Sequence, residues 1–141
     1  MDYGKILGSN FYASFLALPR QKRDAMTALY NFCRHVDDIA DGELDRKQKI
    51  KMLAECRREL EKCYGGKPRA AIFRDLQKYI VRHKIRREHL SGIIEGAEMD
   101  LRKARYADFA ELRKYCHCAA SCVGLASLRV FGCGDEAKEY A

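Results

Sequence analysis

The spacing of apolar residues between Arg20 and Gly42 is the feature that most constrains how this chain can fold. Apolar side chains recur there at steps of three and four residues: Ala25, Met26, Leu29, Phe32, Cys33, Val36 and Ile39. Such spacing places them along one side of an α-helix about 34 Å long. The 141-residue chain contains only two prolines, and helical spacing continues between its few glycines. The sequence therefore predicts an all-α fold.

We expect six helices joined by short loops, which form a helical bundle in one domain spanning residues 1–141. The expected ranges are 9–18, 20–42, 44–63, a helix after the turn at 65–68, 87–103 and 108–131. In the third of these helices, Ile50, Leu53 and Leu60 are expected to face the core. The residues after Gly132 resemble the opening of a further helix, so we expect the bundle to be incomplete at its carboxyl end.

The composition is that of an ordinary folded domain, with 48% hydrophobic and 33% charged residues. No stretch approaches the roughly 18 consecutive apolar residues that span a bilayer. Residues 1–10 lack the apolar run and cleavage site of a secretory signal. We therefore expect the protein in the cytoplasm, with its seven cysteines present as reduced thiols.

Positive charge is concentrated between Lys67 and Arg105, in a chain whose net charge is +7. Aromatic residues do not interleave with these charges as a single-strand platform requires, so we expect no nucleic-acid partner. A diphosphate substrate or an anionic membrane surface fits the charge equally well. A solvated face is the commoner interpretation of the run 82–87, and peripheral membrane contact is the alternative.

Four polar residues share another face of the helix expected at 20–42. Tyr30, Arg34, Asp37 and Asp41 are separated by steps of four, three and four. Two carboxylates four residues apart repel each other unless a cation lies between them. Magnesium prefers oxygen ligands and is held by one or two carboxylates together with phosphate oxygens. The pattern indicates a Mg2+ site at Asp37 and Asp41, and the alternative is a solvated acidic patch.

Three segments resemble the squalene/phytoene synthase family, in the family's order and across nearly the whole chain. They are the block with Ser9–Tyr12, Leu18–Pro19, Arg23 and Tyr30–Asp41, then Gly96–Leu101, which is similar to a GMxMDL element, and Tyr115–Gly124, which is similar to a YCxxVAxxVG helix. The resemblance implies a bundle of the isoprenoid synthase type. It also implies a prenyltransferase that uses Mg2+ to join two prenyl diphosphates head to head.

The same resemblance implies roles for individual residues. Asp37 and Asp41 match a metal-binding cluster, Arg34 is placed for a diphosphate, and Tyr115 matches a tyrosine that stabilises the cation or handles the proton. The substrate-binding residues that it implies are Ser9, Phe11, Phe15, Tyr30, Arg34, Ala119 and Gly124. Of the acidic residues nearby, Asp100 has the family's support, whereas Glu95 and Glu98 are expected at the surface.

Two departures from the family pattern leave alternatives open. Ala119 stands where valine is usual, so both farnesyl and geranylgeranyl diphosphate remain candidate substrates. A second DxxxD cluster, which belongs to a later helix, has no counterpart before Ala141. Because the segment 127–132 looks closest to the bacterial squalene branch, we expect presqualene diphosphate or squalene as product. The alternatives are a phytoene synthase, or a non-catalytic diphosphate-binding half that needs a carboxyl-terminal partner chain.

Overall fold

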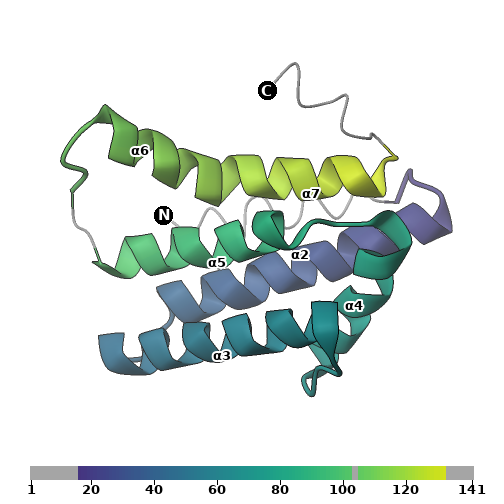
Figure 1. The fold of residues 1–141 in the computed structure, drawn as a ribbon, viewed down its shortest axis with the longest axis horizontal. Coiled ribbons are helices and arrows are strands. Elements are labelled where there is room, and N and C mark those ends of the chain that lie inside the picture. The colour runs from purple at the N-terminus through teal and green to yellow at the C-terminus, as the bar shows by residue number, and fades with distance from the viewer. Residues whose placement is uncertain (1–15, 103–104, 133–141) are drawn as a thin grey trace.

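The computed structural model describes residues 16–102 and 105–132, and within these ranges every regular element is helical (Figure 1). The elements are α2 (Arg20–Asp41), α3 (Arg46–Gly65), α4 (Ala71–His83), α5 (Arg87–Arg102), α6 (Phe109–Cys116), the π-helix η1 (His117–Ser121) and α7 (Cys122–Val130). The all-α prediction is confirmed. The expected helix at 9–18 lies mostly outside the described residues, and residues 16–18 form turns and a bend.

Helix α5 lies at the centre of the bundle. It packs against α2 and α3 on one side and against η1 and α7 on the other, as Figure 1 shows. Helix α4 lies across the end of the bundle where α2 begins and α7 ends. None of the helices in the described part of the chain is both long enough and apolar enough to cross a membrane.

The apolar stripe of α2 supplies the largest part of the core, as its spacing predicts. Phe32 and Val36 are fully buried, and the ring of Phe32 meets that of Phe73 edge-on at 5.9 Å between centroids. Leu53 and Leu60 of α3 are buried as expected. The expectation for Ile50 is wrong, because this residue is 43% exposed. It lies in the second turn of α3, near the amino-terminal end of the helix.

A π-helical segment interrupts the last helix, which the sequence predicts to be continuous. The five residues of η1 join α6 to α7 where they pass over two glycines of α5. A Cβ atom at Gly92 would lie 2.5 Å from Sγ of Cys122, and one at Gly96 would lie 3.3 Å from the backbone nitrogen of Ala119. Glycine at these positions therefore allows α5 to lie close to η1 and α7: a side chain at Gly92 would force a shift, and one at Gly96 would make a tight contact.

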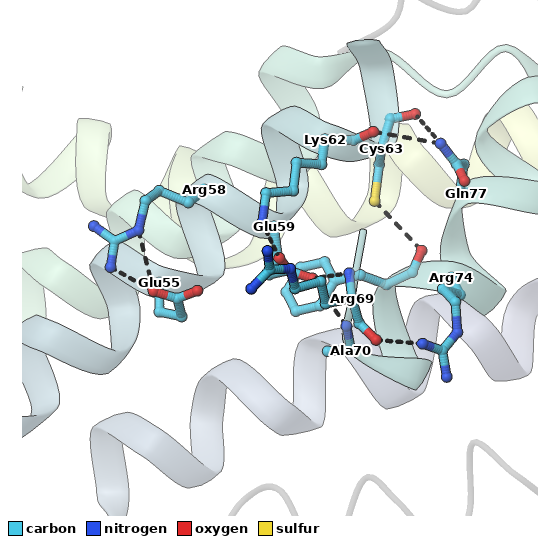
Figure 2. A network of polar contacts seen from close by, with 10 residues as sticks. Glu55, Arg58, Glu59, Lys62, Cys63, Arg69, Ala70, Arg74 and Gln77 are labelled. Atoms are coloured by element: carbon cyan, nitrogen blue, oxygen red, sulfur yellow. Dashed lines mark hydrogen bonds and ion pairs between the residues drawn. The ribbon is translucent and has the colours of Figure 1, made fainter. Parts of the chain in front are cut away.

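A buried carboxylate holds the corner between α3 and α4 (Figure 2). Glu59 is 4% exposed and accepts hydrogen bonds from the backbone nitrogens of Arg69, at 2.6 Å, and Ala70, at 2.9 Å. Lys62 forms an ion pair with the same carboxylate at 2.6 Å. Because Ala70 cannot cap α4 with its own side chain, Glu59 ties the start of α4 to α3 from across the corner.

Candidate functional site

The polar face predicted on α2 is present in the structure. Tyr30, Arg34, Asp37 and Asp41 lie on one helix, and Nη1 of Arg34 donates a hydrogen bond to the hydroxyl oxygen of Tyr30 at 3.2 Å. Nε of Arg34 also lies 3.8 Å from a carboxylate oxygen of Asp38. The guanidinium group therefore bridges the tyrosine and one edge of the aspartate cluster.

The carboxyl group of Asp37 lies among other negative charges. Its pKa is raised from an ordinary 3.8 to about 6, first by desolvation and then by the charges of Asp41, Asp38 and Asp100. Asp37 itself lies at an exposed position of α2. A bound cation would reduce the repulsion among these carboxylates, and a divalent cation would reduce it most.

Asp100 brings a second helix to this cluster. It lies in the last turns of α5, and the hydroxyl group of Tyr115 in α6 donates a hydrogen bond to its carboxylate at 3.1 Å. The ring of Tyr106 lies 5.2 Å from that of Tyr115, between centroids. The pKa of Tyr115 is raised above its ordinary range, first by burial and then by the hydrogen bond to Asp100. Tyr115 is thus joined to the aspartate end of the bundle through Asp100.

The path of the backbone explains why Asp100 and Tyr115 meet. Asp108, the first residue of the helix expected at 108–131, caps α6 by accepting a hydrogen bond from the backbone nitrogen of Glu111 at 2.9 Å. Gly96 brings α5 against η1 one turn before Asp100. The sequence prediction omits Asp100 from the site, although its resemblance to the GMxMDL element is a signal for it. No sequence signal points to Tyr106.

Of the remaining predicted site residues, some lie in the described helices and others lie outside the described residues. Ala119 in η1 and Gly124 in α7 are both exposed. Their expected role as a tunnel wall stays a prediction. Ser9, Phe11 and Phe15 lie outside the described residues.

The glutamates near Asp100 have structural partners. Glu98 forms a bidentate ion pair with Arg57 of α3, with oxygen–nitrogen distances of 2.7 and 2.8 Å. Its side chain is only 17% exposed, so the expectation of a surface glutamate is wrong for this residue. Glu95 pairs with Lys114 of α6 at 2.7 Å. These two ion pairs connect α5 to α3 and to α6. Asp100 is the acidic residue of α5 whose charge raises the pKa of Asp37.

Within residues 16–102 and 105–132, no three His, Cys, Asp or Glu side chains gather closely enough to hold a metal ion by themselves. Magnesium keeps several waters and takes phosphate oxygens, so it needs only one or two protein carboxylates. Asp37 and Asp41 fit that requirement by their oxygen donors, their spacing of one helical turn and the excess negative charge around Asp37.

Two surface hollows of the described residues are lined by residues other than the aspartates. One of about 380 Å³ lies between α3 and α5 and is lined by Arg57 and Ser91. One of about 890 Å³ lies along α6 and η1 and is lined by Phe109 and His117. Asp37, Asp38 and Asp41 are themselves exposed.

Known proteins carry the same sequence features and the same fold. The squalene/phytoene synthase family matches residues 7–141. Presqualene diphosphate synthase of Rhodopseudomonas palustris is 42% identical over 130 residues, which are 92% of this chain and 46% of that protein. The 15-cis-phytoene synthase of Synechococcus elongatus is 34% identical over 122 residues, which are 86% of this chain and 40% of that protein.

A solved structure gives the same result. Squalene synthase HpnC of Alicyclobacillus acidocaldarius superposes with a TM-score of 0.83 and 32% sequence identity, over 92% of this chain and 49% of that one. The chain therefore belongs to the squalene/phytoene synthase family, whose relatives are prenyltransferases with the isoprenoid synthase fold. It spans about half the length of the relatives that it matches.

Proposed function

We propose that this chain forms the amino-terminal part of an enzyme that joins two molecules of farnesyl diphosphate head to head, giving presqualene diphosphate or squalene. The observation that carries the proposal is the cluster at the end of α2, where Asp37 and Asp41 lie on one face with Arg34 and Tyr30. In a chain of this family, such a face suits the diphosphate of an allylic substrate.

Asp37 and Asp41 would hold Mg2+, which neutralises charge on the leaving diphosphate. Arg34 lies one turn before Asp38 and would add a guanidinium to the same diphosphate. Tyr30 would lie at the boundary between the charged face and the prenyl chain, where its ring can stabilise a carbocation. Tyr115 would act on the same cation from α6.

The prenyl chain needs an apolar enclosure that excludes water from the cation. Ala119 and Gly124 would form part of this wall, together with Ser9, Phe11 and Phe15. Because both described residues are exposed, the enclosure would be completed by further chain. We propose that a carboxyl-terminal portion or partner chain supplies it, together with the second aspartate cluster.

Two other functions are supported by particular observations. A phytoene synthase acting on geranylgeranyl diphosphate is favoured by the 34% identity to the Synechococcus elongatus enzyme and by the small side chain of Ala119. A non-catalytic diphosphate-binding half is favoured by coverage of only 46% of the Rhodopseudomonas palustris relative. Contact with a membrane surface through the basic run 82–87 stays a prediction.

Calorimetric titration of the 141-residue chain with a non-cleavable thiolo analogue of farnesyl diphosphate tests the proposal. We expect binding that requires Mg2+ and is lost in Asp37→Ala. Asp75→Ala is the matched control, because Asp75 is an exposed aspartate on α4 that pairs only locally with Lys78. Equal binding without Mg2+, or by Asp37→Ala, contradicts the proposed site.

The same assay separates the alternatives. Tighter binding of the geranylgeranyl analogue favours phytoene synthesis over the squalene branch. We expect little or no turnover of farnesyl diphosphate by the 141 residues. Product formation by this chain would refute the requirement for a carboxyl-terminal portion.

A further inference from the structure

Positive and negative charge are concentrated in different parts of this chain. Residues 67–87 contain eight lysine and arginine residues and one aspartate, so their net charge of +7 equals that of the whole chain. Residues 37–45 contain five acidic residues and no lysine or arginine. The acidic segment begins in the last turns of α2, whereas the basic segment includes α4 and the loops on either side of it. The bundle therefore carries its excess positive charge around α4.

The end of α4 lies beside the start of α2 and the end of α7. The pKa of His83 is lowered by desolvation and then by the charges of Arg82 and Lys22, so both cations lie near the imidazole ring. Nζ of Lys22 also donates a hydrogen bond to the backbone oxygen of Phe131 at 3.4 Å. Three segments that are far apart in the sequence thus form one surface, at the end of the bundle where α2 begins (Figure 1).

This surface combines basic and apolar side chains. Lys78 and Arg82 lie on the side of α4 opposite its buried residues, and Val81 beside them is 72% exposed. Lys84 follows α4 and is also exposed, and the ring of Phe131 is partly exposed. We call these residues the α4 surface: Lys22, Lys78, Val81, Arg82, Lys84 and Phe131.

The cations of the α4 surface differ in how far the fold neutralises them. Lys78 pairs with Asp75 at 3.2 Å. Arg82 and Lys84 form no ion pair with any other residue in the described part of the chain. The α4 surface therefore presents two unneutralised cations on either side of an exposed valine.

This combination suits an anionic lipid surface better than a protein or a nucleic acid. The core of a protein interface is depleted in lysine and charged groups, whereas Lys78, Arg82 and Lys84 surround Val81 closely in sequence. A single-stranded nucleic acid needs aromatic side chains on which bases stack, and Phe131 is 39% exposed. A helix that lies on a membrane places apolar side chains at the acyl boundary and its cations among lipid phosphates.

We infer that the α4 surface docks this chain on an anionic phospholipid membrane, with Val81 and Phe131 at the level of the lipid headgroups. The inference goes beyond the proposed function and does not depend on it, because the surface includes neither Asp37 nor Asp41. It replaces the general attraction of a basic run by a defined surface that joins α4 to the ends of α2 and α7.

The charge distribution also gives the docked chain an orientation. Lys22 and Asp41 lie near opposite ends of α2, roughly 28 Å apart along the helix axis. This separation exceeds the Debye length of about 8 Å at physiological salt, so the acidic segment is screened from the lipid charges when α4 faces the membrane. The aspartate end would be repelled if it faced the membrane instead.

Flotation with vesicles of phosphatidylcholine that contain about one third phosphatidylglycerol tests the inference. We expect the native chain to float with these vesicles, to remain unbound with pure phosphatidylcholine, and to be released by about 1 M salt. The double variant Arg82→Gln, Lys84→Gln should bind about twentyfold more weakly, because each cation near an anionic membrane contributes about fivefold.

The double variant Arg46→Gln, Lys47→Gln is the matched control. It removes the same two charges from exposed positions in the first turn of α3, next to the acidic segment. Its affinity for the vesicles should be that of the native chain. Equal losses in the two double variants would show that net charge, and not the α4 surface, causes binding. Equal binding to neutral vesicles, or tighter binding to a single-stranded oligonucleotide at the same salt, would also overturn the inference.

Single tryptophans test the orientation, because the native chain contains none. Val81 and Phe109 are 72% and 76% exposed, so a tryptophan at either position leaves the core intact. Phe109 begins α6, towards the other end of the bundle (Figure 1). On saturating anionic vesicles with brominated acyl chains, the fluorescence of Val81→Trp should shift to the blue and be quenched, and that of Phe109→Trp should not change. Quenching of Phe109→Trp, or none of Val81→Trp, overturns the inference.

The docking and the proposed function fail separately. The double variant Arg82→Gln, Lys84→Gln should bind the farnesyl diphosphate analogue with Mg2+ as the native chain does, because Asp37 and Asp41 are unchanged. Asp37→Ala should bind anionic vesicles at least as tightly as the native chain, because it removes a negative charge. A loss of vesicle binding in Asp37→Ala would contradict docking through the α4 surface.

Discussion

Two carboxylates in this bundle meet opposite environments. Glu59 lies at the α3–α4 corner, where the Lys62 ammonium group and the backbone nitrogen of Ala70 lower its pKa from 4.5 to about 2, against the effect of burial. Asp37 lies at the far end of α2, where desolvation and neighbouring aspartates raise its pKa to about 6. The fold provides Glu59 with partners that stabilise its negative charge, whereas the negative charge of Asp37 would be stabilised by a bound ligand.

The pH dependence of stability should differ in sign between the two regions. Since the folded-state pKa of Glu59 is lowered, its contribution is complete above about pH 4.5 and is lost as the pH falls towards 2. Since the folded-state pKa of Asp37 is raised, its contribution is complete below about pH 3.8 and is lost as the pH rises through 6. A carboxylate that weakens the folded chain at neutral pH is more readily explained by ligand binding than by folding.

The largest effect is expected at the α3–α4 corner. Glu59→Ala should lower the free energy of unfolding by about 3 kcal/mol at pH 7, because two backbone N–H groups and Lys62 lose a buried acceptor. Urea denaturation measures the change. The difference from the native chain should shrink as the pH falls from about 4.5 towards 2.

Glu55→Ala is the matched control for this variant. Glu55 lies one turn earlier on α3, its side chain is 57% exposed, and it pairs with Arg58 (Figure 2). We expect a loss of at most about 0.5 kcal/mol. Similar losses in the free energy of unfolding of Glu59→Ala and Glu55→Ala would contradict the view that Glu59 stabilises the α3–α4 corner.

A smaller effect is expected where α5 passes under η1. Gly96→Val should lower the free energy of unfolding by about 2 kcal/mol, because its Cβ would lie 3.3 Å from the backbone of Cys118 and Ala119. The same variant should lower the pKa of Tyr115 by moving it away from Asp100. Gly124→Val is the control, since nothing lies within 4 Å of a Cβ at Gly124. An equal loss at both positions would show that helix propensity, and not close packing, sets the cost.

The smallest effect on stability is expected at Asp37. Asp37→Asn should raise the free energy of unfolding by about 0.5 kcal/mol at pH 7.5 without Mg2+, because one of several like charges is removed. The gain should disappear below about pH 3.8, where Asp37 is protonated in both states.

Magnesium sharpens this prediction. The native chain should be stabilised by Mg2+ in thermal denaturation and Asp37→Asn should not be, since only the former keeps both carboxylates. Asp24→Asn, an exposed aspartate paired with Arg20 on the same helix, should respond to Mg2+ as the native chain does. Stabilisation of Asp37→Asn by Mg2+ would place the ion elsewhere.

The sequence predicted most of the helices and the polar face of α2. The α2 stripe, the start of α6 at Asp108 and the alignment of Arg34 with Asp37 and Asp41 all follow from spacing along one helix. The burial of Ile50 and the surface position of Glu98 were predicted wrongly, because each depends on what a neighbouring helix covers. The interruption by η1 was not predicted, since no local pattern in residues 117–121 distinguishes it from an α-helix.

The feature that first constrained the fold, the apolar stripe of α2, determined by itself that one face of this helix is buried and another is polar. Helical geometry is local, so residues three and four apart must share a face in any tertiary structure. Tertiary structure alone decided that Asp100 reaches Asp37, that Tyr115 donates to Asp100 from 15 residues away, and that Glu59 holds the start of α4. These contacts join different helices, and their geometry depends on how closely the backbones pack, which Gly92 and Gly96 set for α5.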